Sequence, residues 1–194
     1  MARVLTAEIA GPGKAIHACA VLLGETGVLI LGKPGAGKST LALQLLSDAV
    51  CRGMCARHIG DDRVLLAVAS GRLIARPHPA IAGYAERRWE GIVPVEHESA
   101  AVMNAAVELV ESTENYLQRL PVAADATVAI NGIAVPCLRL PVSLDPRAQS
   151  LRIADFIVRL TAAGPARRKT LPLANSAAMT NMTALDAART GKLG

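Results

Sequence analysis

The sequence predicts an α/β fold, in which a mixed sheet with hairpins surrounds a glycine-rich loop and helices flank the sheet. Three observations lead to this prediction. The apolar run 28–31 enters the glycine-rich segment 32–39, and a helix-forming stretch follows it. Turn signals between short apolar runs predict hairpins, and Asn131-Gly132 is the strongest of them. Asp145-Pro146 predicts a second helix, with Asp as its cap and Pro in its first turn.

The first half of the chain predicts a hairpin that feeds the glycine-rich loop. A short strand is expected over 3–10, and Gly11-Pro12-Gly13 ends it. The next apolar run, 15–23, connects through the tight turn 24–27 to the strand before the loop. A helix over 38–50 follows the loop, and a second hairpin is expected from 64–69 and 73–75.

In the second half of the chain, the sequence pattern predicts secondary structure less clearly until about residue 126. We expect a charged loop over 84–91 before another strand, whereas the pattern of 100–111 fits a strand or a helix equally well. A turn is expected at 115–121. Strands at 126–130 and 133–140 flank Asn131-Gly132, and the second helix ends near residue 160.

Composition limits the class of protein. A chain of 194 residues with 52% hydrophobic content suits one core, which we expect over 1–163, followed by a basic, flexible tail over 164–194. Counting Arg167, Arg168, Lys169, Arg189 and Lys192 against Asp186 places 5 − 1 = +4 of the net charge of +5 in that tail. Because the body is nearly neutral and aromatics are 2%, no nucleic-acid partner is expected. No apolar stretch is long enough for a membrane span and no signal peptide is evident, so a cytoplasmic location is expected.

The segment Gly32-Lys33-Pro34-Gly35-Ala36-Gly37-Lys38-Ser39 predicts a phosphate-binding loop. Glycines let backbone N–H groups turn toward phosphate oxygens, and the N-terminus of the following helix adds partial positive charge. Lys38 is expected to reach the β- and γ-phosphates of ATP, and Ser39 to ligate Mg²⁺. The alternative is an ordinary glycine-rich turn. The residues predicted to contact the nucleotide are Gly32, Gly35, Ala36, Gly37, Lys38, Ser39 and Thr40.

Asp61 and Asp62 are adjacent carboxylates at the mouth of the strand expected over 64–69. Like charges raise one another's pKa unless a cation lies between them, so a pair downstream of a phosphate-binding loop suggests Mg²⁺ and a general base. The alternative is a solvated turn in which one of the two residues is a cap. Cys51 and Cys55, with His58, do not match a standard zinc signature, and we interpret the cysteines as small, partly buried residues.

Several motifs in this order resemble a known family, the catalytic domain of HPr kinase/phosphorylase, in the short alphaproteobacterial form that lacks the N-terminal domain. The resemblance covers roughly 5–160. It rests on His17, the turn 24–27, the loop 32–39, Asp61-Asp62-Arg63-Val64, the segment 71–77 and Glu86-x-Arg88-x-x-Gly91-Ile92. It implies a P-loop kinase domain of the HPr kinase type, using ATP and Mg²⁺ to phosphorylate a serine of the phosphocarrier protein HPr. It also implies a hexamer and leaves the reverse reaction, phosphorolysis, open.

The resemblance also implies roles for individual residues. Asp61 would be the base that takes the proton of the attacking serine, and His17 would lie beside it. Ser39, Asp62 and Glu86 would surround the metal. Arg88 would act with Glu86 in the loop that faces the substrate, and Lys38 would hold the phosphates.

The sequence also departs from the family pattern. Lys33 and Pro34 stand where the family usually has Asp and Ser, Trp89 replaces a small residue, and Lys33 should make the loop more electropositive. From residue 89 to 118 the chain has neither Arg nor Lys, which predicts an altered partner surface. That interval carries Glu90, Glu96, Glu98, Glu108, Glu111 and Glu114. The alternative function is therefore a diverged nucleotide-binding regulatory module without phosphoryl transfer.

Overall fold

The computed structural model describes residues 15–87, 89–111 and 127–162. The strand predicted over 3–10, the turn predicted over 115–121, Arg88 and the predicted tail lie outside these ranges. The described residues form a mixed α/β fold, as the sequence predicts.

The main sheet has nine strands within the described ranges. Seven of them follow one path, in the order β1 (Ala15–Ile16), β5 (Val64–Ala69), β6 (Arg72–Pro77), β9 (Ala101–Val110), β3 (Thr26–Gly32), β2 (Cys19–Leu23) and β4 (Ala56–Gly60). β11 (Ile133–Pro141) also pairs with β9, and β10 (Thr127–Ile130) pairs with β11. β3 and β11 run parallel to β9, whereas the remaining pairs are antiparallel, which makes the sheet mixed.

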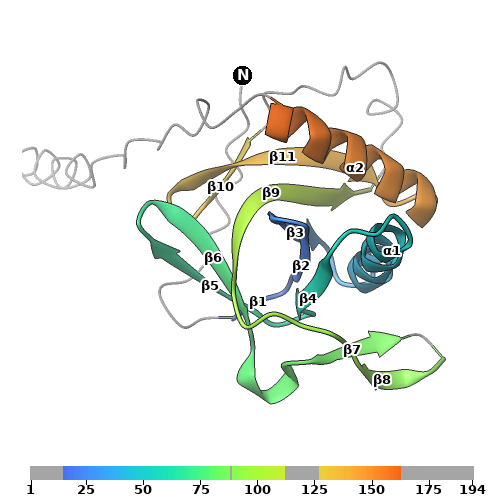
Figure 1. Ribbon diagram of the computed structural model, residues 1–194. Coiled ribbons are helices and arrows are strands. Elements are labelled where there is room, and N and C mark those ends of the chain that lie inside the picture. The colour runs from blue at the N-terminus through green and yellow to red at the C-terminus, as the bar shows by residue number, and fades with distance from the viewer. Residues whose placement is uncertain (1–14, 88, 112–126, 163–194) are drawn as a thin grey trace, which may run out of the picture.

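Two helices and a separate hairpin complete the described fold. α1 (Lys38–Cys51) and α2 (Pro146–Ala162) lie side by side against the curled sheet, as Figure 1 shows. A 3₁₀ turn, η1 (Pro79–Ile81), leads to the two-stranded hairpin of β7 (Tyr84–Arg87) and β8 (Gly91–Pro94), which projects at the bottom of the same view. Neither helix is long and apolar enough to cross a membrane in the part of the chain described.

The sheet buries apolar side chains on both of its faces. On the helix side, Leu41 and Leu45 of α1 and Ile153 and Phe156 of α2 pack with residues of β2, β3, β9 and β11. On the other face, the curl of β5, β6, β10 and β11 encloses a second cluster that includes Leu29 of β3. Because β3 is buried on both faces, the loop that follows it starts from a rigid strand.

Most of the predicted elements are confirmed. The hairpins at 19–32, 64–77 and 127–141 form, and Asn131 and Gly132 both have positive φ, as a type I′ turn requires. Asp145 caps α2, since its Oδ1 accepts a hydrogen bond from the backbone N–H of Arg147 at 2.9 Å.

The secondary structure of two segments became clear only in the tertiary structure. The segment 100–111, for which the sequence allowed a strand or a helix, contains the long strand β9. This strand pairs with β3, β6 and β11, which supply its backbone hydrogen-bond partners. The expectation of a loop over 84–91 is wrong in part, because Tyr84–Arg87 pairs with Gly91–Pro94 as a hairpin.

Candidate active site

The loop between β3 and α1 has the strand–loop–helix arrangement that its sequence predicts. A Cβ at Gly32 would lie 3.1 Å from the carbonyl oxygen of Leu109, and the φ of 152° is one that other residues rarely adopt, so glycine favours this close approach of the loop to β9. Gly37 caps α1 in the left-handed conformation, and its carbonyl accepts the N–H of Leu41 at 2.9 Å. The first N–H groups of α1 therefore face the loop, as an anion-binding site requires.

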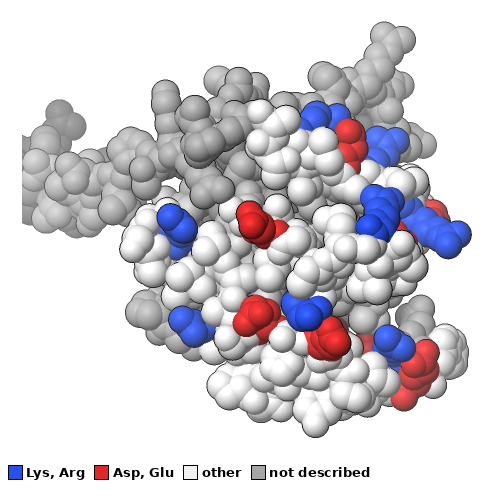
Figure 2. All heavy atoms as spheres, in the orientation of Figure 1, with Lys and Arg blue, Asp and Glu red and all other residues white. Residues whose placement is uncertain are grey.

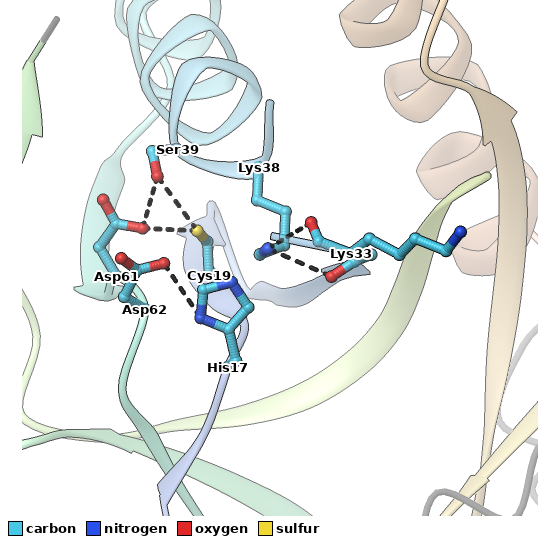
Figure 3. Close-up of polar contacts among 8 residues, drawn as sticks. His17, Cys19, Lys33, Lys38, Ser39, Asp61 and Asp62 are labelled. Atoms are coloured by element: carbon cyan, nitrogen blue, oxygen red, sulfur yellow. Dashed lines mark hydrogen bonds and ion pairs between the residues drawn. The ribbon is translucent and has the colours of Figure 1, made fainter. Parts of the chain in front are cut away.

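Lys38 is almost completely buried, with 4% of its surface exposed. Its Nζ donates hydrogen bonds to the carbonyl oxygens of Gly32 and Lys33 at 3.2 and 3.0 Å. These contacts hold the ammonium group inside the curve of the loop, as Figure 3 shows. Neutral carbonyl acceptors leave its positive charge available for a negatively charged group.

Ser39 and Asp61 meet at the start of α1. Oγ of Ser39 donates a hydrogen bond of 2.8 Å to Oδ1 of Asp61, and Asp61 is 8% exposed. Sγ of Cys19 donates a second hydrogen bond of 2.6 Å to the same oxygen and lies 3.8 Å from Oγ of Ser39. Figure 3 shows the three side chains converging from β2, from α1 and from the end of β4. This group of three, the Cys19–Ser39–Asp61 cluster, places a carboxylate beside the loop.

Asp62 points to a different partner. Its φ of 58° lies in the left-handed region, and the N–H of Arg63 bonds to the carbonyl of Asp61 at 2.6 Å, which forms a tight turn. Oδ1 of Asp62 lies 3.3 Å from Nδ1 of His17. The turn thus directs adjacent carboxylates to separate partners. The resemblance implied that His17 lies beside Asp61, whereas the ion pair of His17 in the described structure is with Asp62.

Lys33 does not add free positive charge to the loop, contrary to the expectation from its sequence. Its Nζ lies 3.0 Å from Oε2 of Glu111 and points away from Lys38, as Figure 3 shows. Because both side chains are exposed, the pair is screened by solvent, but it offsets the charge of Lys33 locally.

The glutamates after Trp89 are largely paired with basic residues from elsewhere. Glu108 lies 2.6 Å from Arg139 on the neighbouring strand, and Glu96 lies 2.7 Å from Arg57. Glu90 pairs with Arg87 at 3.3 Å. On the face that Figure 2 shows, acidic and basic side chains are interspersed. The acidic run therefore does not make an uncompensated negative surface in the described ranges.

The remaining predicted residues have few contacts. Glu86 is exposed on β7 and, within the described residues, makes no polar contact with the Cys19–Ser39–Asp61 cluster; Thr40 is exposed on α1. Arg88 lies outside the described residues, and Trp89 beside it is 96% exposed. Cys51 and Cys55 are exposed, so the expectation of partly buried cysteines is wrong for both.

The donor set suits a hard divalent cation together with a phosphate. No group of three His, Cys, Asp or Glu side chains among the described residues could hold a metal ion by itself. Magnesium, however, binds through one or two protein oxygens plus substrate phosphates and waters. Ser39 and Asp61 supply such oxygens 2.8 Å apart, and Lys38 and the N-terminus of α1 suit phosphate. The residues therefore fit Mg²⁺ bound with a nucleotide.

Cys19 is the member of the site that the sequence did not reveal. A buried cysteine on an apolar strand is usually a small core residue, and nothing in its local pattern distinguishes it. The only available signal was its position, two residues after His17 in the apolar run 15–23.

A strand, a glycine-rich loop and a helix that carries Lys and Ser, with a carboxylate against the Ser, are typical of α/β domains that handle phosphoryl groups. The family model of the HPr Serine kinase C-terminal domain matches residues 10–161. The chain belongs to this family.

Curated relatives agree with this assignment. The HPr kinase/phosphorylase of Mycoplasma mycoides subsp. mycoides SC is 33% identical over 138 residues, which are 66% of this chain and 42% of that protein. The HPr kinase/phosphorylase of Neisseria meningitidis serogroup C is 33% identical over 131 residues, or 62% of this chain and 39% of that protein. The chain thus spans about two fifths of the length of these relatives.

The structure of the HPr(Ser) kinase/phosphatase from Coxiella burnetii has the same fold. It superposes with a TM-score of 0.63 over 77% of this chain and 92% of that chain, at 24% sequence identity. The mixed α/β fold predicted from the sequence is confirmed by this likeness.

Proposed function

We propose that the protein is an ATP-dependent, Mg²⁺-dependent serine kinase that phosphorylates an HPr-like phosphocarrier protein. The observation that carries the proposal is the contact between Ser39 and Asp61 beside the buried Lys38, in a chain of the HPr kinase family. A hydroxyl, a carboxylate and a buried ammonium group at the N-terminus of a helix are the groups that phosphoryl transfer needs.

The positions of the described groups support the following roles. Lys38 leaves the loop carbonyls and holds the β- and γ-phosphates, together with the N–H groups of the loop and of α1. Asp61 takes the proton of the acceptor serine hydroxyl as the new oxygen–phosphorus bond forms and the bond to the departing ADP breaks. Ser39 would hold the cation next to Asp61, and the family resemblance adds Asp62, whose Oδ1 lies 3.3 Å from Nδ1 of His17. Magnesium, when bound, neutralises charge on the phosphate oxygens.

Two roles rest on the family alone. Glu86 joins the metal site, and Arg88 acts beside it in the segment that faces the substrate. The site residues Gly32, Gly35, Ala36, Gly37 and Thr40 complete the nucleotide contacts. We further propose a hexamer in the cytoplasm, with phosphorolysis of the phosphoserine product as a reverse activity. The internal pairing of the glutamates supports a partner surface less altered than the sequence suggests.

The test is transfer of labelled phosphate from ATP to the phosphocarrier proteins of the source organism. We expect one of them to be labelled on serine, with a loss of at least about 100-fold in Asp61→Ala, because a general base contributes 10²–10⁴-fold. Asp155→Ala is the matched control, since this exposed carboxylate pairs only with Arg159 among the described residues. Bound nucleotide without label on any carrier would overturn the proposed substrate and favour the regulatory module.

A further inference from the structure

We propose that Cys19 is a positioning residue: its thiol fixes the orientation of the Asp61 carboxylate and leaves the second oxygen of that carboxylate free to accept a proton. This inference rests on the proposed function, because it assigns the way in which the base of that reaction is held. It concerns a residue outside the motifs that the sequence analysis identified.

Hydrogen bonds hold one side of the Asp61 carboxylate. Oδ1 accepts from Sγ of Cys19 at 2.6 Å and from Oγ of Ser39 at 2.8 Å. Oδ2 makes no hydrogen bond within the described residues, and Figure 3 shows it directed away from the thiol. A carboxylate held by two donors on one oxygen cannot rotate without breaking both bonds. The free oxygen therefore keeps a fixed direction relative to the loop.

The two donors differ in how firmly they are placed. Ser39 is in the first turn of α1, and in the proposed function it also ligates the cation. Cys19 lies within β2, opposite Ile30 of β3, and is completely buried in the core on the helix side. The strand therefore supplies Asp61 with a donor that is independent of the loop and of the cation.

A thiol suits this position chemically. It packs like a small apolar side chain, so it adds a donor to the core without the desolvation cost of a hydroxyl. Burial, and next the charge of Asp61, raise the pKa of the Cys19 thiol, which is consistent with a thiol that donates its hydrogen. The contact thus joins the apolar core directly to the proposed base.

Three substitutions at one position separate orientation from packing. Cys19→Ser keeps a donor, Cys19→Val approximately keeps the volume without a donor, and Cys19→Ala keeps neither. We expect kcat for transfer to fall about tenfold or more in the Val and Ala variants, because a small misplacement of a catalytic group can cost up to ~100-fold. KM for ATP should stay within about twofold, since Lys38 and the loop are unchanged. The Ser variant should retain kcat within about threefold.

The same variants also test whether Cys19 acts only through packing. Thermal unfolding and circular dichroism establish that each variant is folded at the assay temperature. A Val variant with wild-type kcat would overturn the proposal, as would a Ser variant that loses as much kcat as the Ala variant. A rise in KM for ATP that accounts for the whole loss would also overturn it.

A second measurement does not require transfer. Denaturant unfolding of Cys19→Val, Asp61→Ala and the double variant reports whether the two residues interact, because contacting side chains show non-additive effects. We expect removal of the donor to cost stability when Asp61 is present and to cost less when it is absent. Additive effects would overturn the inferred contact. If the wild-type protein labels no carrier, that result counts against the proposed function, whereas the non-additivity decides the contact by itself.

Discussion

Nζ of Lys33 lies 3.0 Å from Oε2 of Glu111, and this ion pair joins the glycine-rich loop to the residue that follows strand β9. Lys33 lies in the loop and Glu111 in the acidic run that the sequence singled out as unusual, and the structure brings the two residues together. The extra positive charge of the loop is balanced by one of the glutamates of the acidic run. The charges of Lys33 and Glu111 therefore offset one another locally, and both residues determine the charge near the proposed nucleotide site.

Removing the ion pair between Lys33 and Glu111 should change the affinity for ATP slightly. In Glu111→Gln, Lys33 loses its partner, and we expect ATP to bind up to about fivefold more tightly, because an exposed ion pair is worth at most about 1 kcal/mol. Calorimetric titration at low and at high salt measures the effect, which should shrink with salt. Glu98→Gln, which removes an exposed carboxylate with no salt bridge in the described ranges, is the control. Weaker binding by Glu111→Gln would contradict the prediction.

Lys38 should be essential, whereas Lys33 should not. We expect Lys38→Met to lower kcat/KM for transfer by at least about 100-fold, because it removes the buried charge that the proposed function assigns to the transferred phosphate. Lys33→Met is the matched control in the same loop and should change kcat/KM by less than about fivefold. Steady-state kinetics with the labelled carrier protein measure both. Equal losses in the two variants would indicate a general effect of positive charge.

His58 should make the stability of the fold dependent on pH. It is 2% exposed, and its Nδ1 has no hydrogen-bond partner among the described residues; burial lowers its pKa against an opposing effect of Asp61 and a further lowering by His97. The unfolded chain therefore takes up a proton near the ordinary pKa of 6.5, while the folded chain does so only at lower pH. Stability should be complete above about pH 7 and should fall as the pH drops through 6.5 toward the folded pKa.

Urea unfolding between pH 7.5 and 5.5 measures this dependence. His58→Met removes the titrating group and should give a shallower decline over the same interval. His78→Met, at a half-buried position before η1, is the control and should decline like the wild-type protein. A variant at His58 with an unchanged slope would assign the pH dependence to other groups.

Phe156 should account for much of the docking of α2. It is 3% exposed in the core cluster that joins both helices to the sheet, so Phe156→Ala is expected to lower the free energy of unfolding by about 3–5 kcal/mol. Leu151→Ala, on the same helix but with 59% of its surface exposed, should cost less than about 1 kcal/mol. Chemical denaturation of both variants compares them directly. Similar losses would mean that α2 buries a different face.

Local chemistry predicted much of this fold. The turn at Asn131-Gly132 and the cap at Asp145 form as the sequence predicts, because positive φ and capping depend on residues within a few positions. The helix after the glycine-rich loop is similarly local. The strand β9 could not be assigned, because its apolar side chains are consistent with two periods and its partners lie far away in the sequence.

The candidate site likewise has features that the sequence predicts and features that only the tertiary structure decides. The sequence by itself determined which groups are present: the loop with Lys38 and Ser39, the adjacent pair Asp61 and Asp62, and the strand that leads into the loop. The tertiary structure decided how they are used. It directed Asp61 to Ser39 and Asp62 to His17, and it added Cys19 from 42 residues away. The physical reason is that spacing and turn chemistry act over a few residues, whereas the meeting of side chains depends on strand register and helix packing across the whole core.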